Sequence, residues 1–98
     1  MAGNNIAFAL GLAQKAGKAA SGDFAVRAAL KSGQVQLLLV AADAAPNSKK
    51  DMHYLAEVME VPVLEALTRA ELGHAIGKAQ RTAVAILNSN FANMLLKK

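Results

Sequence analysis

Apolar residues recur at the spacing of an amphipathic helix in several stretches of this 98-residue chain. Val26, Ala29 and Leu30 have this spacing, and so do the apolar residues between positions 52 and 59. Residues three or four apart lie on one face of an α-helix, so each stretch predicts a helix that packs one face against a core.

Between these stretches lie short apolar runs without polar alternation, at 37–42 and 82–87. Continuous apolar runs of this length are typical of strands that are covered on both faces. Residues 61–64 predict a third strand, with Pro62 at its start or edge, and residues 18–21 add a short fourth strand at an edge. Strands separated by helices predict an α/β protein, a three-layer α/β/α sandwich in one domain over residues 1–98.

Two helix starts carry capping signals. Thr68 and Glu71 have the spacing of a capping box, in which each side chain accepts a hydrogen bond from the other residue's backbone N–H. Ser48 and Asp51 have the same spacing, with Asp as a shorter substitute for Glu. The spacing therefore predicts helices that begin after Ser48 and after Thr68.

Several classes of chemistry are missing from the sequence. The absence of cysteine excludes disulfides, thiolate metal sites and cysteine catalysis, and His53 and His74 are too far apart in sequence for a local metal pair. The chain has no nucleophile elbow, dinucleotide fingerprint or phosphate-binding loop. It also has no signal peptide and no apolar run long enough to cross a membrane. We expect a cytoplasmic protein that is not an enzyme and that uses no cofactor, metal or membrane.

The positive charge is concentrated near the predicted turns and helix starts. The chain has 11 Lys and Arg against 7 Asp and Glu, a net charge of +4, which favours a polyanionic partner. Lys15, Lys18, Arg27 and Lys31 bracket the turn at residues 21–23 in the sequence. Helix N-termini near Gly22, Ser48 and Thr68 would offer backbone N–H groups to phosphates. The alternative is that these are scattered surface charges.

Aromatic residues make up only 4% of the chain, which argues against a base-stacking platform. We expect Tyr54 and the three Phe residues to pack in the core or between helices. A bound RNA would then be a structured element that is recognised through its backbone shape.

A set of short segments matches one known family in both order and spacing: residues 10–18, 21–22, 31–33, 40–45, 49–50, 61–63, 72–78 and 91–92. Through them, nearly the whole chain resembles the ribosomal protein L7Ae/L30e family. The resemblance implies an α/β/α sandwich with a small four-stranded mixed sheet, and binding of kink-turn RNA, a sharply bent internal loop with tandem sheared G·A pairs. The implied partner is ribosomal or ribosome-associated RNA.

In that family the helix after the glycine enters the widened major groove, and archaeal members present an Asn-Glu-x-x-Lys pattern there. Counting from Gly22, this chain has Phe24, Ala25 and Ala28 at those three positions, so the groups that would read guanine edges are missing. The resemblance therefore implies RNA binding with weak selectivity, and Phe24 either packs on a base or faces the core. The candidate RNA contacts are Gly22, Asp23, Phe24, Arg27, Lys31, Lys49, Lys50 and Arg69.

Two other functions stay open. The first is a ribosome-associated protein-interaction adaptor that has lost tight kink-turn binding, which the apolar residues at positions 24, 25 and 28 favour. The second, which also follows from the resemblance, is an accessory substrate-binding domain for RNA modification, because domains of the implied fold occur joined to RNA methyltransferase domains.

Overall fold

Helices and strands alternate strictly along residues 2–96, which the computed structural model describes. The first elements are α1 (Ala2–Lys15), β1 (Ala19–Ser21), α2 (Asp23–Lys31) and β2 (Leu37–Val40). They are followed by α3 (Pro46–Val58), β3 (Val63–Glu65), α4 (Arg69–Ala75), β4 (Ala83–Ile86) and α5 (Ser89–Leu96).

The four strands form one mixed sheet in the order β1-β4-β2-β3. β4 runs antiparallel to both β1 and β2, whereas β3 pairs parallel to β2. The two central strands, β2 and β4, are buried at every position, as expected for strands covered on both faces. The predicted short strand before Gly22 is present as β1, and it forms one edge of the sheet.

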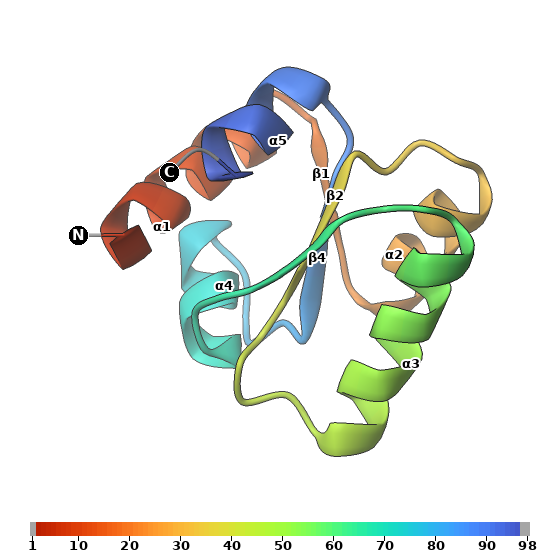
Figure 1. Cartoon of the computed structure of the whole chain (residues 1–98). Coiled ribbons are helices and arrows are strands. Elements are labelled where there is room, and N and C mark those ends of the chain that lie inside the picture. Colours follow the sequence, from red (N-terminus) through yellow and green to blue (C-terminus); the bar gives the residue numbers. More distant parts are fainter. Residues whose placement is uncertain (1, 97–98) are drawn as a thin grey trace.

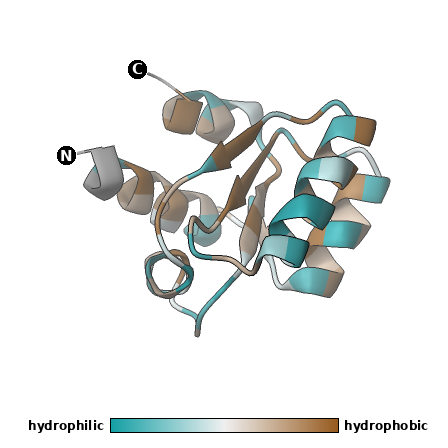
Figure 2. Cartoon of the chain, turned by 60° about the horizontal axis from the view of Figure 1, so that its bottom comes forward, coloured by the Kyte–Doolittle hydropathy of each residue, from teal (hydrophilic) through white to brown (hydrophobic). Residues whose placement is uncertain are grey.

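Helices cover both faces of this sheet. α1, α4 and α5 lie together on one face, and α2 and α3 lie side by side on the other (Figure 1). The strands are the most hydrophobic part of the chain and lie between the two helical layers (Figure 2). The structure therefore confirms the three-layer α/β/α sandwich with a small mixed sheet. No helix within residues 2–96 is long and apolar enough to cross a membrane.

The two predicted capping boxes have different outcomes. The box at Thr68 is present: the Glu71 N–H donates to Thr68 Oγ1 (3.1 Å) and the Thr68 N–H donates to Glu71 Oε1 (2.8 Å). The box at Ser48 is wrong, because α3 begins at Pro46 with Ala45 as its N-cap. Proline at the first helical position needs no N–H partner and fixes φ for the helix, so the helix starts earlier than the Ser48 signal indicates.

The expectation that the aromatic residues are core residues is also wrong for three of the four. Phe8 is 67% exposed, Phe24 is 85% exposed and Tyr54 is 63% exposed, while only Phe91 packs partly buried against the core. In α2 the buried residues are Val26, Ala29 and Leu30. Phe24 precedes Val26 by two residues, about 200° around the helix, so its side chain faces away from the sheet.

Candidate nucleic-acid interface

Three helices begin along the side of the sheet where strands start or end, which is different from the edge formed by the outermost strand. The carboxyl ends of β1, β2 and β3 and the amino end of β4 meet there, because β4 runs opposite to the other three strands. α2, α3 and α4 each follow one of those strands, so their first turns surround this edge (Figure 1). We call it the helix-start edge; it comprises residues 22–23, 41–48, 66–69 and 80–83.

Backbone hydrogen bonds hold the loops of the helix-start edge together. The Ala41 N–H donates to the Thr82 carbonyl and the Ala42 N–H donates to the Leu67 carbonyl, each at 2.8 Å. The Arg81 N–H donates to the Arg69 carbonyl at 3.1 Å. These hydrogen bonds join the three loops to one another, so the loops form one continuous surface with a fixed arrangement.

The first turns of the three helices differ in what satisfies their N–H groups. At α4, Thr68 caps the helix and the Asp43 carboxylate accepts from the Arg69 N–H (2.8 Å). At α2 and α3 the N-caps are Gly22 and Ala45, and neither helix has a side-chain cap hydrogen bond. The first N–H groups of an α-helix have no partner within the helix, so α2 and α3 offer donors that an anion can take.

Gly22 is the residue that brings β1 into α2. Its φ of +91° lies in the region that L-residues with a side chain avoid. A Cβ at this position would meet no atom within 4 Å, so the backbone conformation, and not a lack of space, requires glycine. The turn also leaves the backbone at the start of α2 accessible to a ligand.

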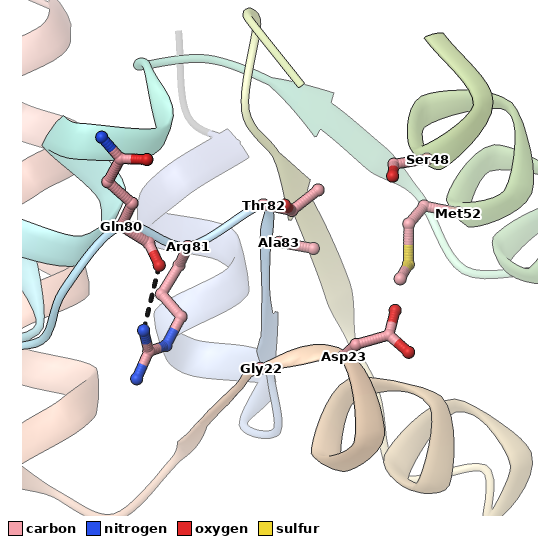
Figure 3. A pocket seen from close by; sticks show the side chains of 8 residues that line it. All are labelled: Gly22, Asp23, Ser48, Met52, Gln80, Arg81, Thr82 and Ala83. Atoms are coloured by element: carbon pink, nitrogen blue, oxygen red, sulfur yellow. Dashed lines mark hydrogen bonds between the residues drawn. The ribbon is translucent and has the colours of Figure 1, made fainter. Parts of the chain in front are cut away.

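A hollow of about 210 Å³ opens between the start of α2, the first turn of α3 and the start of β4. Thr82 and Ala83 lie on one side of it, Ser48 and Met52 of α3 lie on the opposite side, and Gly22 and Asp23 lie below them in the view of Figure 3. Gln80 and Arg81 complete its lining. The lining thus combines a carboxylate, a guanidinium, two hydroxyls and an amide.

Three of the predicted cationic contacts already have carboxylate partners. Arg27 donates to Asp23 (2.8 Å) and to Asp51, and these two hydrogen bonds raise its pKa above the ordinary arginine value. Lys49 lies 3.4 Å from Glu65, and Arg69 lies 3.6 Å from Asp43. The charges of these residues are therefore partly neutralised within the protein.

The remaining predicted cations, Lys31 and Lys50, have no ion pair among the described side chains of residues 5–96, but they lie apart. Lys50 lies one turn into α3, near the helix-start edge, whereas Lys31 is the last residue of α2. At a rise of 1.5 Å per residue, Lys31 lies roughly 12 Å along the helix from Asp23. Lys15 and Lys18 precede β1 and Gly22 follows it, so these two lysines lie at the opposite end of that strand from Gly22.

Arg81 is a cation of the helix-start edge that the sequence reasoning missed. Its guanidinium donates to the carbonyls of Gln80 (2.9 Å) and Ala79 (3.2 Å) and weakly to Ser21 Oγ (3.4 Å), and none of the described carboxylates pairs with it. Arg81 directly precedes a predicted strand, but only the antiparallel placement of β4 beside β1 brings it near Gly22.

The histidines do not build a metal site with other residues. Among the described residues, no group of three His, Asp or Glu side chains could hold a metal ion. His53 Nε2 instead donates to Glu65 Oε2 at 2.7 Å, and this hydrogen bond is the main reason that the pKa of Glu65 is lowered below 4.5. The pair ties α3 to the edge strand β3.

Comparison with known proteins agrees with this architecture. The model of the ribosomal protein L7Ae/L30e/S12e/Gadd45 family matches residues 4–96. The chain is 36% identical over 87 residues to the RNA-binding protein YlxQ of Bacillus subtilis strain 168, which covers 89% of this chain and 87% of that protein. It is 34% identical over 83 residues to the RNA-binding protein YlxQ of Enterococcus faecium, with 85% and 80% covered.

A solved structure of a protein of unknown function from Bacillus halodurans is also similar. It superposes with a TM-score of 0.87 and 30% identity, over 95% of this chain and 93% of the other. The family match spans nearly all of the chain and includes every element of the helix-start edge. The chain belongs to the ribosomal protein L7Ae/L30e/S12e/Gadd45 family.

Proposed function

We propose that this protein binds structured, bent RNA of the kink-turn kind through the helix-start edge, and that the RNA is ribosomal or ribosome-associated. The observation that carries the proposal is the pair of uncapped helix starts, α2 and α3, on either side of a hollow that Arg81 borders. Two nearby relatives are named RNA-binding proteins, which supports the same class of ligand.

Each part of the edge has a role in this proposal. The backbone N–H groups at the start of α2 donate hydrogen bonds to phosphate oxygens, and the glycine turn lets the RNA backbone approach closely. Arg81 and Lys50 add positive charge that no described carboxylate neutralises. The hollow takes an unpaired nucleotide at the bend, with Ser48 and Thr82 as hydroxyl partners.

A bent RNA fits this edge better than a straight duplex does. The start of α2 and the start of α3 flank the hollow, so a ligand that uses both must present phosphates on two sides of one unpaired nucleotide. A-form RNA has a deep, narrow major groove that side chains do not reach, whereas a bend widens the groove and exposes bases.

Fluorescence-anisotropy titrations with a kink-turn duplex and a straight duplex of equal length test the proposal. We expect tighter binding to the kink-turn and a loss of affinity as salt rises. Arg81→Gln should weaken binding and reduce the salt slope by about one unit, while Arg81→Lys should keep the slope. Equal affinity for both duplexes would refute selectivity for bent RNA, and no binding at low salt would refute RNA binding.

The second candidate is a protein-interaction adaptor. Its support is that Arg27, Lys49 and Arg69 are ion-paired while Phe24 and Tyr54 are exposed. Affinity capture before and after nuclease treatment of a lysate separates the two candidates. A protein partner that stays bound after the nuclease supports the adaptor, and loss of all partners supports RNA binding.

A further inference from the structure

We propose that Phe24 stacks on an unpaired base of the bound RNA, so that the ligand must present an unstacked purine next to its bend. This inference rests on the proposed RNA-binding function and specifies how the ligand is recognised. Phe24 has the most exposed large apolar side chain among those described, with 85% of its surface exposed.

The Phe24 side chain is not part of the packing of α2 against the sheet. α2 is attached to the sheet through Val26, Ala29 and Leu30, which are at most 8% exposed. Phe24 lies on the opposite side of the helix, so its ring is free to contact a ligand. An aromatic ring in water offers a flat apolar face, which is the surface on which nucleobases stack.

The surroundings of Phe24 suit a nucleic acid. Ala28 and Lys31 follow at the i+4 and i+7 positions of the same outward stripe, so a small residue and an unneutralised cation lie beyond the ring. The two carboxylates on this side, Asp23 and Asp51, are both engaged by Arg27. The solvent-facing side of α2 formed by Phe24, Ala28 and Lys31 is therefore apolar at the helix start and positive at the helix end. This arrangement is complementary to an RNA strand that stacks one base on Phe24 and places a phosphate near Lys31.

The position of Phe24 along α2 links stacking to phosphate binding. Phe24 is the second residue of a helix whose first turn has no side-chain cap. A phosphate held by the N–H groups of this turn places the base of the same nucleotide, or of the next one, within reach of the ring. A purine has the larger ring face, so stacking favours an unpaired adenine or guanine over a pyrimidine.

The test uses a kink-turn RNA with an unpaired adenine next to the nucleotide that occupies the hollow, and the same RNA with an abasic site in place of that adenine. We expect Phe24→Ala to weaken binding of the adenine RNA about tenfold, the effect of losing one stacked base, and to leave the abasic RNA unaffected. Phe24→Trp should preserve or improve binding of the adenine RNA. 2-Aminopurine in place of the adenine should be quenched by the native protein and not by Phe24→Ala.

Phe8→Ala is the matched control, because Phe8 is also largely exposed but lies on α1, in the opposite helical layer. This variant should bind both RNAs like the native protein. Equal loss for the adenine and the abasic RNA, or no loss for either, overturns the stacking role while the proposed function stands. If the native protein binds none of these RNAs, the proposed function itself fails. Capture of a protein through Phe24 from nuclease-treated lysate would also overturn the inference.

Discussion

At the scale of single residues, Gly73 controls the position of the loop that carries Arg81. A Cβ on Gly73 would lie 1.9 Å from the carbonyl oxygen of Ala79, and the Gly73 carbonyl accepts from the Lys78 N–H at 2.8 Å. Neither group can move without shifting the loop between α4 and β4. Glycine inside a helix is unfavourable by itself, so its presence here reflects this close approach of two backbone segments.

We predict that Gly73→Ala destabilises the protein by about 3 kcal/mol, the upper end for an overpacked site, since the clash involves backbone. Chemical denaturation measures the change. Gly11→Ala is the control: its Cβ would lie 3.3 Å from the Ala75 carbonyl oxygen, so small shifts accommodate it. A native-like free energy of unfolding for Gly73→Ala would contradict the prediction. Gly73→Ala should also weaken RNA binding, because it displaces Arg81.

From the hydrogen bond between His53 and Glu65 we predict how the stability of the protein depends on pH. This hydrogen bond lowers the pKa of Glu65 below 4.5, with a smaller contribution from Lys49. Because the folded-state pKa is lower than the unfolded one, the stabilisation is complete above about pH 4.5 and is lost as the pH falls through the folded-state value. NMR titration of the Glu65 carboxyl should show its pKa rising in His53→Ala. His74→Ala, which changes an exposed histidine on α4, should leave the Glu65 pKa unchanged.

At the scale of elements, the ends of the helices decide how the chain turns back to the sheet. Gly33 takes a φ of +77° after α2, whereas the equivalent position after α3 is Glu60, with a φ of +58°. The Val61 N–H donates to the Ala56 carbonyl (2.8 Å), which closes the turn after α3 in the manner of a glycine-ended helix. Glu60 thus holds a left-handed conformation that is unfavourable for a residue with a side chain.

Glu60→Gly should therefore stabilise the protein by about 1 kcal/mol, because it removes the left-handed penalty at an exposed position. Gly33→Ala should destabilise it by a similar amount for the opposite reason. Thermal unfolding of both variants provides the measurement. The prediction fails if the two substitutions shift the melting temperature in the same direction.

The elements also show what local sequence can and cannot predict. The capping box at Thr68 was predictable, because its partners lie three residues apart and the signal is complete within one turn. The start of α3 was missed because Pro46 competes with Ser48 as a start signal. The exposure of Phe24 was missed because composition says nothing about which face of a helix meets the sheet. The pairing of Arg27 with Asp51 joins two helices and depends on how they pack.

At the scale of the whole molecule, the sheet order determines where the charge acts. The alternation of elements indicated the sandwich, but only the placement of β4 between β1 and β2 brings Arg81 beside Gly22. The same topology puts Lys50 near the helix-start edge and Lys15 at the end of α1, in the other helical layer. The net charge of +4 therefore says less about where RNA would bind than the positions of the Lys and Arg side chains that have no ion pair among the described residues.

The comparison of Lys50 with Lys15 tests this distribution. Both lysines are exposed and neither has an ion pair among the described side chains, so their substitution by alanine removes the same charge. If RNA binds at the helix-start edge, Lys50→Ala reduces the slope of log affinity against log salt by about one unit, since one phosphate contact is lost. Lys15→Ala changes neither the affinity nor the slope beyond the effect of net charge. Both variants lower the net charge by one, but only a lysine that contacts a phosphate at a defined interface changes the number of counterions released on binding. Equal slopes for the two variants would therefore mean that the positive charge attracts RNA without a defined interface.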